Sequence, residues 1–301
     1  MYIQYENPFD VGMNGLLGYG AAHEATHEAD LLILLGTDFP YNDFLPDANV
    51  AQVDINGSHI GRRTKISYPV TGDVAATIEN ILPHVDEKKD RSFLDKMLKK
   101  HYGKLEHVVE AYTSNVDKHT PIHPEYVADL IDRNADEDAI FTVDTGMCNV
   151  WGARYITANG KREQIGSFRH GTMANALPQA LGAQAANPGR QVITFSGDGG
   201  LSMLMGELLT VKLHNLPIKM FVFNNSSLGM VKLEMLVQGL PEHETDHESV
   251  NFAKIAEASG IKHFRIEDPK EAPEQIKKAL AYNGPAPVSY THLTLPTTPY
   301  V

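Results

Sequence analysis

Cysteine is nearly absent from this chain, which has one, Cys148, in 301 residues. Internal disulfides are therefore excluded, and a reducing, cytoplasmic location is expected. Positive charge is also scarce, since 26 Lys and Arg stand against 38 Asp and Glu and give a formal net charge of -12 at pH 7. Such a chain has little to replace the counterions of a phosphate backbone, so nucleic acid is not expected as a partner. No run of about 20 apolar residues predicts a membrane-spanning helix.

The chain does contain short β-branched apolar runs that alternate with stretches of helical spacing, as in a parallel α/β sheet covered by helices. Near the start, ADLLILLGTDFPY and NVAQVDIN each predict a strand, and residues 73–85 predict an amphipathic helix. After Pro121 a helix to Ile131, the strand AIFTVD, the turn TGMCNV and a helix over 151–158 are expected. These patterns predict a small doubly wound layer at 1–85, linking helices at 86–119, a larger parallel-sheet domain at 120–288, and a tail at 289–301.

An acidic, glycine-rich turn and a paired-asparagine turn lie one helix and one strand apart in the larger domain. The first, GDGG at 197–200, follows the apolar strand QVITFS, and the second follows the strand IKMFVF and contains Asn225. A single helix over 201–214 is predicted between them. A right-handed crossover brings the carboxyl ends of both strands to one edge of the sheet, where open parallel sheets bind ligands. Asp198 and Asn225 are therefore predicted to face the same small volume.

Carboxylate and amide oxygens in these turns suit a divalent cation. Mg2+ accepts such ligands when a bound diphosphate supplies others. The glycines Gly197, Gly199 and Gly200 let the backbone approach a diphosphate closely, and the next helix begins at the same place. The alternative is an ordinary turn in which Asp198 only caps the helix.

Both halves of this pattern, at this spacing, resemble the diphosphate motif of thiamine diphosphate enzymes. The segment SFRHGTMANALPQALGAQ, residues 167–184, resembles the pyruvate oxidase and quinone-linked pyruvate dehydrogenase branch of that family. The resemblance implies that Met173 is the apolar wedge that bends the cofactor, while Thr172 lies beside it and the Gly171 carbonyl accepts a bond from the aminopyrimidine. The alternative for Met173 is ordinary core packing.

The segment NNSSLGMVKLEM resembles the same branch. By that resemblance the metal is held by Asp198, Asn225 and the Ser227 carbonyl, and Glu234 is a catalytic carboxylate near the substrate. The alternative for Glu234 is a solvated helix residue. Met230 stands where quinone-linked relatives carry an aromatic residue. The remaining residues expected to bind the cofactor are Leu228, Gly229 and Met230.

The amino-terminal layer begins with NPFDVGMNGLLGYG, a glycine-rich stretch without a GxGxxG pattern, which alone is a weak nucleotide-binding signal. Together with GTDFPY and DIN it resembles the flavin-binding middle domain of the same oxidases. This resemblance implies an FAD site, with Asp54 on the ribose hydroxyls. Its residues are Asn14, Gly15, Leu16, Leu17, Thr37, Asp38, Phe39, Pro40, Tyr41 and Asp54.

Two histidine-containing segments suggest other chemistry. The sequence HEATH at 23–27 matches the HExxH pattern of zinc peptidases. It directly precedes a predicted buried strand, and no third zinc ligand can be identified, so a zinc hydrolase is the disfavoured alternative. The stretch PEHETDHE at 241–248 is predicted to be a solvated loop or a flap over the cofactor.

The resemblance implies thiamine diphosphate, Mg2+ and FAD as cofactors and oxidative decarboxylation of pyruvate to acetate and CO2, with electrons passed to a quinone or oxygen. The full-length parent would be a homo-oligomer, dimer or tetramer, with a peripheral contact at the inner face of the cell membrane. The alternatives are an acetolactate synthase-like carboligase and an acetyl-phosphate-forming pyruvate oxidase.

Both ends differ from the family pattern. No segment corresponds to the pyrimidine domain of these enzymes, so the chain is expected to be an inactive fragment, at most a cofactor-binding module. The Thr- and Pro-rich sequence SYTHLTLPTTPYV at 289–301 has no family counterpart. Its prolines predict a poor central strand, and it is interpreted as a non-native tail.

Overall fold

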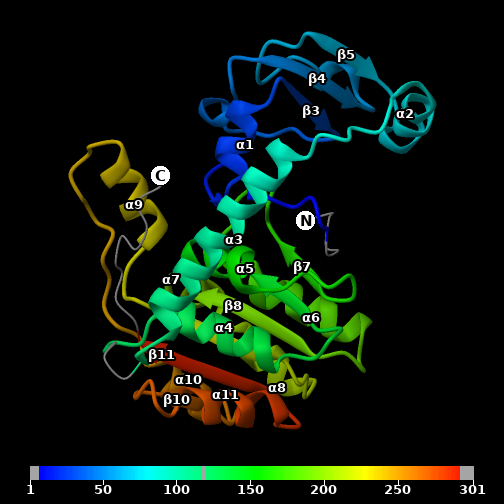
Figure 1. Ribbon diagram of the computed structural model, residues 1–301. Helices are drawn as coiled ribbons and strands as arrows, with labels where there is room; N and C mark the ends of the chain where they lie inside the picture. The colour runs from blue at the N-terminus through cyan, green and yellow to red at the C-terminus, as the bar shows by residue number, and fades with distance from the viewer. Residues whose placement is uncertain (1–6, 117–119, 292–301) are drawn as a thin grey trace. The chain divides into compact units, whose positions relative to one another are not determined.

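A computed structural model describes residues 7–116 and 120–291 of the chain, and Figure 1 shows it as a ribbon. The chain divides into two compact units, one formed by Asn7–Val108 and the other by the described residues from 109 onward. The long helix α3, Ser92–Thr113, begins in the first unit and ends in the second. No helix in the described ranges is long and apolar enough to cross a bilayer.

The first unit is built on a three-stranded parallel sheet of order β3-β4-β5. A short antiparallel hairpin precedes it, and Asp73 caps the helix that follows by accepting a bond from the Ala76 amide at 2.9 Å. The elements of this unit are β1 Gly12–Met13, β2 Tyr19–Gly20, α1 Ala22–Glu28, β3 Leu31–Leu35, η1 Asn42–Phe44, β4 Asn49–Asp54, η2 Gly57–His59, β5 Tyr68–Thr71, α2 Val74–Ile81 and η3 Leu82–His84.

The second unit carries a six-stranded sheet of order β10-β11-β9-β8-β6-β7, and every neighbouring pair is parallel. Its strands are β6 Ile140–Val143, β7 Glu163–Gly166, β8 Val192–Gly197, β9 Lys219–Asn224, β10 Phe264–Ile266 and β11 Ala286–Thr291. Its helices are α4 Pro124–Asn134, α5 Met147–Tyr155, α6 Ala176–Ala186, α7 Asp198–Leu204, α8 Glu207–Leu213, α9 Gly229–Val237, α10 Phe252–Ala258 and α11 Ala272–Ala281.

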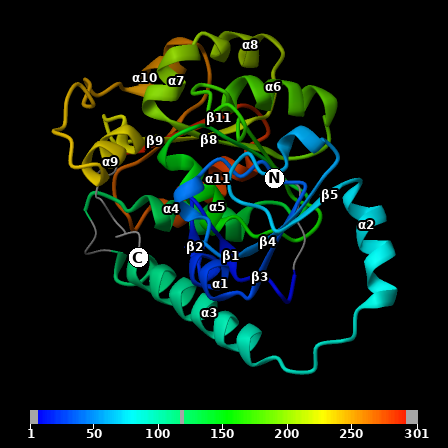
Figure 2. The same ribbon diagram turned by 90° about the horizontal axis from the view of Figure 1, so that it is seen from above.

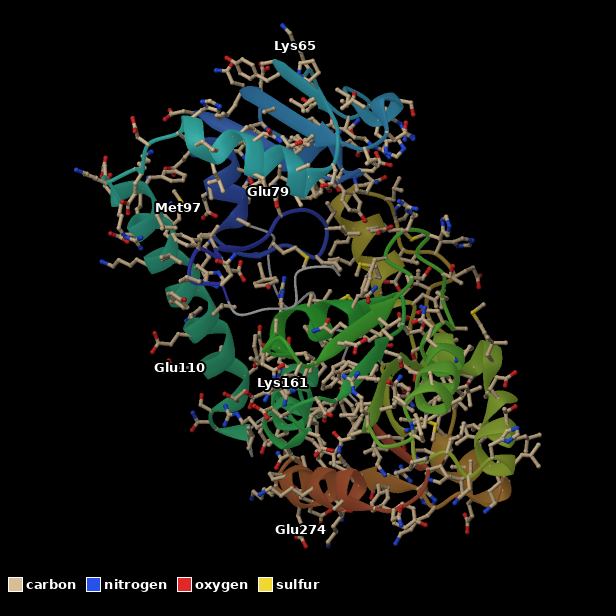
Figure 3. The ribbon with its side chains drawn as sticks, turned by 90° about the vertical axis from the view of Figure 1, so that its right-hand side faces the viewer. Lys65, Glu79, Met97, Glu110, Lys161 and Glu274 are labelled. Carbon is tan, nitrogen blue, oxygen red and sulfur yellow. The ribbon has the colours of Figure 1, made fainter. Side chains whose placement is uncertain are left out.

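Both faces of this sheet are buried, because helices cover each side (Figure 2). Alternate strand residues such as Ile140, Val192 and Met220 join the core under α6, α8 and α10. The intervening residues form an aromatic row on the other face, beneath α4, α5 and α11. In that row the rings of Phe195 and Phe223 lie 5.0 Å apart, centroid to centroid. On α11 the side chain of Glu274 is exposed and points away from the sheet (Figure 3), whereas α8 exposes the apolar side chains of Leu209 and Leu213.

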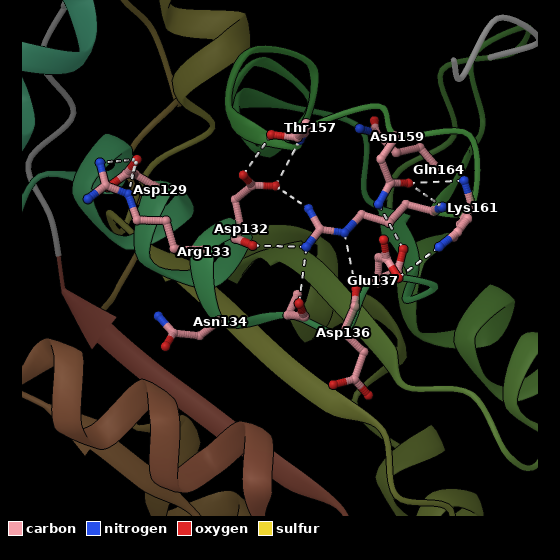
Figure 4. A network of polar contacts seen from close by, with 12 residues as sticks. Asp129, Asp132, Arg133, Asn134, Asp136, Glu137, Thr157, Asn159, Lys161 and Gln164 are labelled. Carbon is pink, nitrogen blue, oxygen red and sulfur yellow. Dashed lines mark hydrogen bonds and ion pairs between the residues drawn. The ribbon is translucent and has the colours of Figure 1, made fainter. Parts of the chain in front are cut away.

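A network of ion pairs and hydrogen bonds holds the end of α4 to the segment that leads into β7 (Figure 4). The Arg162 guanidinium is 2.6 Å from the Asp132 carboxylate and donates to the main-chain oxygens of Asp132, Ala135 and Asp136. Asp132 also accepts a bond from the Thr157 hydroxyl at 2.8 Å. This network lies at the amino ends of the strands, away from the turns with predicted ligands.

The parallel α/β prediction is confirmed, but two local predictions are wrong. The helix predicted over 201–214 is two helices, because the chain turns at Met205 and Gly206 and leaves α7 and α8 as separate short segments. The predicted turn TGMCNV is already helical from Met147, which starts α5 four residues before Trp151.

The carboxy-terminal strand also extends further than predicted. Ser289 and Tyr290 lie in β11, which pairs with β9 on one side and β10 on the other, so they occupy a central strand. Tyr290 is 2% exposed, and its ring centroid lies 5.4 Å from that of Phe223. Neither of these residues is proline, so nothing in them interrupts the ladder. The rest of the predicted non-native tail, 292–301, lies outside the described residues.

Candidate active site

The acidic turn and the paired-asparagine turn meet at the carboxyl edge of the sheet, as predicted. The strands β8 and β9 are adjacent and parallel, with Gly197 opposite Phe223. One carboxylate oxygen of Asp198, Oδ2, accepts hydrogen bonds from the backbone nitrogen of Asn225 at 3.1 Å and from that of Ser226 at 2.6 Å. The two turns are therefore joined directly through the Asp198 side chain.

Asp198 is 3% exposed and is the first residue of α7. Burial raises the pKa of its carboxyl group, while hydrogen bonds from the Gly199 and Ser226 amides and the nearby His247 ring oppose that rise. The other oxygen, Oδ1, accepts from the Gly199 amide at 2.9 Å. A buried carboxylate with this many amide donors is held in one orientation, which is what a fixed metal ligand requires.

The asparagine turn is held in an uncommon backbone conformation. Ser226 has φ of 54°, and the Asn225 side-chain oxygen accepts a bond from the Ser227 amide at 3.1 Å. Ser227 also pairs with Asp246 in an isolated antiparallel bridge. A left-handed non-glycine residue persists only where the surroundings hold it, and such residues often mark functional turns.

Gly199 lies beneath three side chains that come from separate parts of the sequence. A Cβ atom built on Gly199 would be 3.0 Å from Leu228 Cδ2, 3.6 Å from Met173 Cε and 3.9 Å from His247 Nε2. Two of these three residues, Met173 and Leu228, were predicted to bind the cofactor. The structure therefore brings the predicted wedge, the GDG turn and the segment after the asparagine pair to one place.

Met173 itself lies in a tight turn before α6. Gly171 has φ of 61° and Ala174 has φ of 64°, so the turn reverses direction on both sides of the methionine. The Asn175 side chain closes it by donating to the Thr172 carbonyl at 2.6 Å. Gly171 and Thr172 are exposed at its rim.

The donors gathered at this edge fit a magnesium-bound diphosphate. One carboxylate, one amide side chain and the carbonyl of Ser227 are oxygen ligands of the kind that Mg2+ binds. In the GDG turn, Gly197 has nothing within 4 Å of its Cβ position, so the backbone is open there, whereas at Gly200 an added Cβ would lie 2.1 Å from the Asp144 carboxylate and only glycine fits. In the part of the chain that the structure describes, no group of three or more His, Cys, Asp or Glu side chains is placed to hold a metal ion.

The other predicted residues of this site are on α9 or at its start. Gly229 is buried, Met230 is half-buried, and Glu234 is exposed on α9. The structure does not join Glu234 to Asp198 or Asn225 through any hydrogen bond or ion pair among the described residues. Its catalytic role stays a prediction.

Sequence reasoning missed two residues of this site, Asp144 and His247. Asp144 is 1% exposed at the end of β6, where burial raises its pKa to about 6. His247 Nε2 is 3.7 Å from Asp198 Oδ2. The segment 241–248, predicted to be a solvated loop or a flap, is a largely exposed loop, but its second half is held in place: Thr245 is buried, its carbonyl accepts from the Leu228 amide, and the His247 amide donates to the Ser226 carbonyl. The only signal for Asp144 was its place directly after a predicted strand.

In the first unit, the three segments predicted to bind FAD also lie together. The turn after β3 contains Thr37–Tyr41, and Asp54 ends the neighbouring parallel strand β4, so both lie at one edge of the sheet. A Cβ on Gly15, which has φ of 101°, would be 3.0 Å from the Phe39 ring and 3.3 Å from the Tyr41 ring. The Asn14 side chain donates to the Phe44 carbonyl at 2.9 Å, which fixes the Asn14–Leu17 loop beside these rings.

The two predicted acidic residues of this edge already have protein partners. Asp54 accepts from the Asn56 amide at 2.8 Å and is 3.4 Å from the His59 ring. Asp38 pairs with Arg62 and Arg63, and the Arg63 hydrogen bond lowers the pKa of its carboxyl group. A role for Asp54 on a ribose therefore stays a prediction.

The HEATH helix places its two histidines together without a third ligand among the described residues. The rings of His23 and His27 lie 4.2 Å apart, centroid to centroid, and His27 Nδ1 is 2.9 Å from the His23 carbonyl. Glu24 is paired with Lys104 at 2.6 Å. A glutamate held by a lysine is poorly placed to act as the base of a zinc peptidase.

Comparison with known proteins gives two domain matches. Residues 144–289 match the thiamine pyrophosphate enzyme C-terminal TPP binding domain, and residues 1–81 match the central domain of the same enzymes. The chain contains the central and C-terminal domains of thiamine pyrophosphate enzymes. Thiamine pyrophosphate is another name for thiamine diphosphate, so the cofactor implied by the GDG and NN turns agrees with the domain match.

Individual relatives of this thiamine pyrophosphate enzyme chain carry two kinds of name. A putative thiamine pyrophosphate-containing protein, YdaP, of Bacillus subtilis is 34% identical over 286 residues, which are 94% of this chain and 49% of that protein. The acetolactate synthase large subunit of Lactococcus lactis is 32% identical over 89% of this chain and 47% of that protein. A probable acetolactate synthase large subunit of Methanococcus aeolicus is 29% identical over 94% of this chain and 50% of that protein. The chain thus spans about half the length of the curated relatives it matches. Their names support the predicted carboligase alternative better than pyruvate oxidase.

Proposed function

We propose that the chain forms the cofactor-binding part of an acetolactate synthase-like enzyme, which decarboxylates pyruvate and joins the two-carbon unit to a second 2-oxo acid. The convergence of Asp198 with the Asn225 turn beside Gly199 is the observation that carries this proposal. The acetolactate synthases among its relatives support the carboligase reaction.

In this proposal Mg2+ is held by Asp198, Asn225 and the Ser227 carbonyl, and the diphosphate lies on Gly199 and Gly200. Met173, whose Cε is 3.6 Å from the Cβ position of Gly199, would contact the cofactor beside the GDG turn. The bound cofactor supplies a nucleophilic carbon and stores the electrons left by decarboxylation. The apolar side chains of Met173 and Leu228 lie against Gly199 and would shield the bound cofactor from water there.

A second candidate is the oxidation of pyruvate to acetate, or to acetyl phosphate where phosphate takes part, with electrons passed through FAD to a quinone or oxygen. It is favoured by the likeness of residues 167–184 to the oxidase branch and by the gathering of Gly15, Phe39 and Tyr41 at one sheet edge. A homo-oligomer, a peripheral membrane contact and a cytoplasmic location belong to the same set of predictions.

Calorimetric titration of the purified chain with thiamine diphosphate tests the common part of both candidates. Saturable binding that requires Mg2+ is expected, and no binding at millimolar cofactor would contradict the proposal. For the longer protein, incubation with pyruvate separates the candidates. Acetolactate with unchanged flavin absorbance is expected from a carboligase, whereas acetate and bleached flavin would indicate the oxidase.

A further inference from the structure

Asp144 is a buried carboxylate to which the proposed reaction assigns no role. It follows the last residue of β6 and is 1% exposed. Its position between two segments that approach the proposed cofactor site is the starting point of the inference. The two segments are named here the wedge turn, residues 172–175, and the diphosphate turn, residues 197–200.

The first set of contacts joins Asp144 to the wedge turn. Asp144 Oδ1 accepts hydrogen bonds from the backbone nitrogen and the side-chain nitrogen of Asn175, both at 3.0 Å, and from the Thr145 amide, also at 3.0 Å. The same Asn175 side chain donates to the Thr172 carbonyl. One carboxylate oxygen therefore holds the residue that closes the turn around Met173.

The second contact joins Asp144 to the diphosphate turn. A Cβ atom on Gly200 would lie 2.1 Å from Asp144 Oδ2 and 3.4 Å from the Ala174 amide nitrogen. Only a residue without a side chain can lie at this distance, so the carboxylate packs directly on the Gly200 backbone. Gly200 is two residues after the proposed metal ligand Asp198.

We propose that Asp144 is a positioning residue that joins the wedge turn and the diphosphate turn into one unit, so that both keep the spacing that a bent thiamine diphosphate requires. This inference rests on the proposed function for the identity of the ligand. Asp144 itself touches neither metal nor substrate in the proposal. A carboxylate that served only the core would have core partners, whereas the partners of this side chain, apart from the adjacent Thr145 amide, belong to the two turns.

Hydrogen–deuterium exchange of the purified chain tests this coupling without any cofactor. In Asp144→Ala, peptides that cover 172–176 and 198–201 should both exchange at least about fivefold faster than in the wild type, because both turns lose the same support. Asp144→Asn keeps the volume and one acceptor oxygen, so it should show a smaller increase at both turns.

The matched control is Asp132→Ala, which removes a half-buried, hydrogen-bonded carboxylate of the same unit at the far end of the sheet. It should lower the melting temperature and leave exchange at both turns unchanged. A change confined to one turn in the Asp144 variants, or an equal change in Asp132→Ala, would overturn the proposal. If Asp144→Ala does not fold, the same comparison is made with Asp144→Asn and Asp132→Asn.

Calorimetric titration with thiamine diphosphate and Mg2+ then connects the coupling to the ligand. The dissociation constant of Asp144→Ala should rise about tenfold or more, while that of Asp132→Ala stays within about twofold of the wild type. Unchanged affinity in Asp144→Ala would overturn the positioning role. A wild-type chain that binds no cofactor would remove the proposed function, and the exchange data would still decide whether Asp144 joins the turns.

Discussion

Asp198 Oδ2 lies 2.6 Å from the backbone nitrogen of Ser226, so a carboxylate at the end of one strand holds the turn that follows the next strand. Replacing Asp198 therefore removes a proposed metal ligand and the support of a left-handed turn together. Replacing Asn225 removes a proposed ligand and the side-chain oxygen that accepts from the Ser227 amide, but it keeps both bonds to Asp198, because Asn225 and Ser226 donate through their backbone nitrogens.

We expect Asp198→Ala to abolish Mg2+-dependent binding of thiamine diphosphate and to increase hydrogen exchange at residues 225–227. Asn225→Ala should weaken binding at least about tenfold and speed exchange at Ser227 alone, whose amide donates to the Asn225 side chain, while exchange at 225 and 226 stays near the wild-type level. Calorimetry and exchange mass spectrometry measure the two effects. The exposed Asp268→Ala is the control, and a loss of binding in it would contradict the assignment.

Two glycine substitutions in the same unit should change the free energy of unfolding in opposite directions. In Gly200→Ala the new methyl group meets Asp144 Oδ2, so the free energy of unfolding should fall by about 1–3 kcal/mol. Gly182 is exposed in α6 with nothing within 4 Å of its Cβ position, so Gly182→Ala should raise it by up to about 1 kcal/mol. Urea denaturation of the two variants beside the wild type measures both, and a stabilised Gly200→Ala would contradict the close packing.

The Asp144 carboxyl group should make stability depend on pH. Burial raises its pKa from 3.8 to about 6 in the folded chain, so the folded state binds the proton more tightly than the unfolded state does. Its contribution is fully present below pH 4 and is lost as the pH rises through about 6. The loss is about 3 kcal/mol at most, because each pH unit between the two pKa values is about 1.4 kcal/mol.

Asp144→Asn cannot titrate, so its free energy of unfolding should change less between pH 4 and pH 7 than that of the wild type. The Cys148 thiol donates to the Asp144 carbonyl, and burial holds the pKa of that thiol far above this range. Denaturation curves at several pH values measure the difference. Parallel curves for the two proteins would show that Asp144 does not titrate in this window.

The Arg162 network should depend on the shape of the guanidinium group. Arg162 bonds to Asp132 and to three main-chain oxygens at once, which a single ammonium group cannot do. Arg162→Lys should therefore lower the free energy of unfolding by about 1–3 kcal/mol. Arg133 is exposed and pairs with one half-buried carboxylate, Asp129, so Arg133→Lys should change the free energy of unfolding by less than about 1 kcal/mol. Thermal and urea unfolding of both variants provide the measurement, and an equal loss of unfolding free energy in the two would contradict the role of the Arg162 guanidinium shape.

The meeting of the two turns at the proposed metal site could be predicted from the sequence, because it depends only on adjacent strands and the residues that follow them. Apolar runs mark β8 and β9, and parallel strands bring their carboxyl ends together, so Asp198 and Asn225 had to meet. Asp144 could not be predicted in this way, since a single aspartate after a strand does not reveal that an asparagine 31 positions later will bind it.

Three other features were not predicted from the sequence, each for a different physical reason. The apolar period continues through Met205 and Gly206 and predicts one helix, whereas the chain turns there and forms α7 and α8. His247 reaches Asp198 through main-chain pairing of its loop, and side-chain patterns do not report such pairing. The Thr- and Pro-rich composition predicts that Ser289 and Tyr290 belong to a non-native tail, whereas in the structure their backbone pairs with β9 on one side and β10 on the other.

The pairing of Ser289 and Tyr290 in β11 limits how far the chain can be truncated from its carboxy-terminal end. A stop codon directly after Val288 would remove the Tyr290 ring, which packs on Phe223. It would also remove the backbone of Ser289 and Tyr290, with which β9 and β10 pair. Newly bared strand edges beside an apolar surface recruit other chains. Such a clone should yield insoluble protein, whereas one that ends after Thr291 keeps all described residues of the sheet.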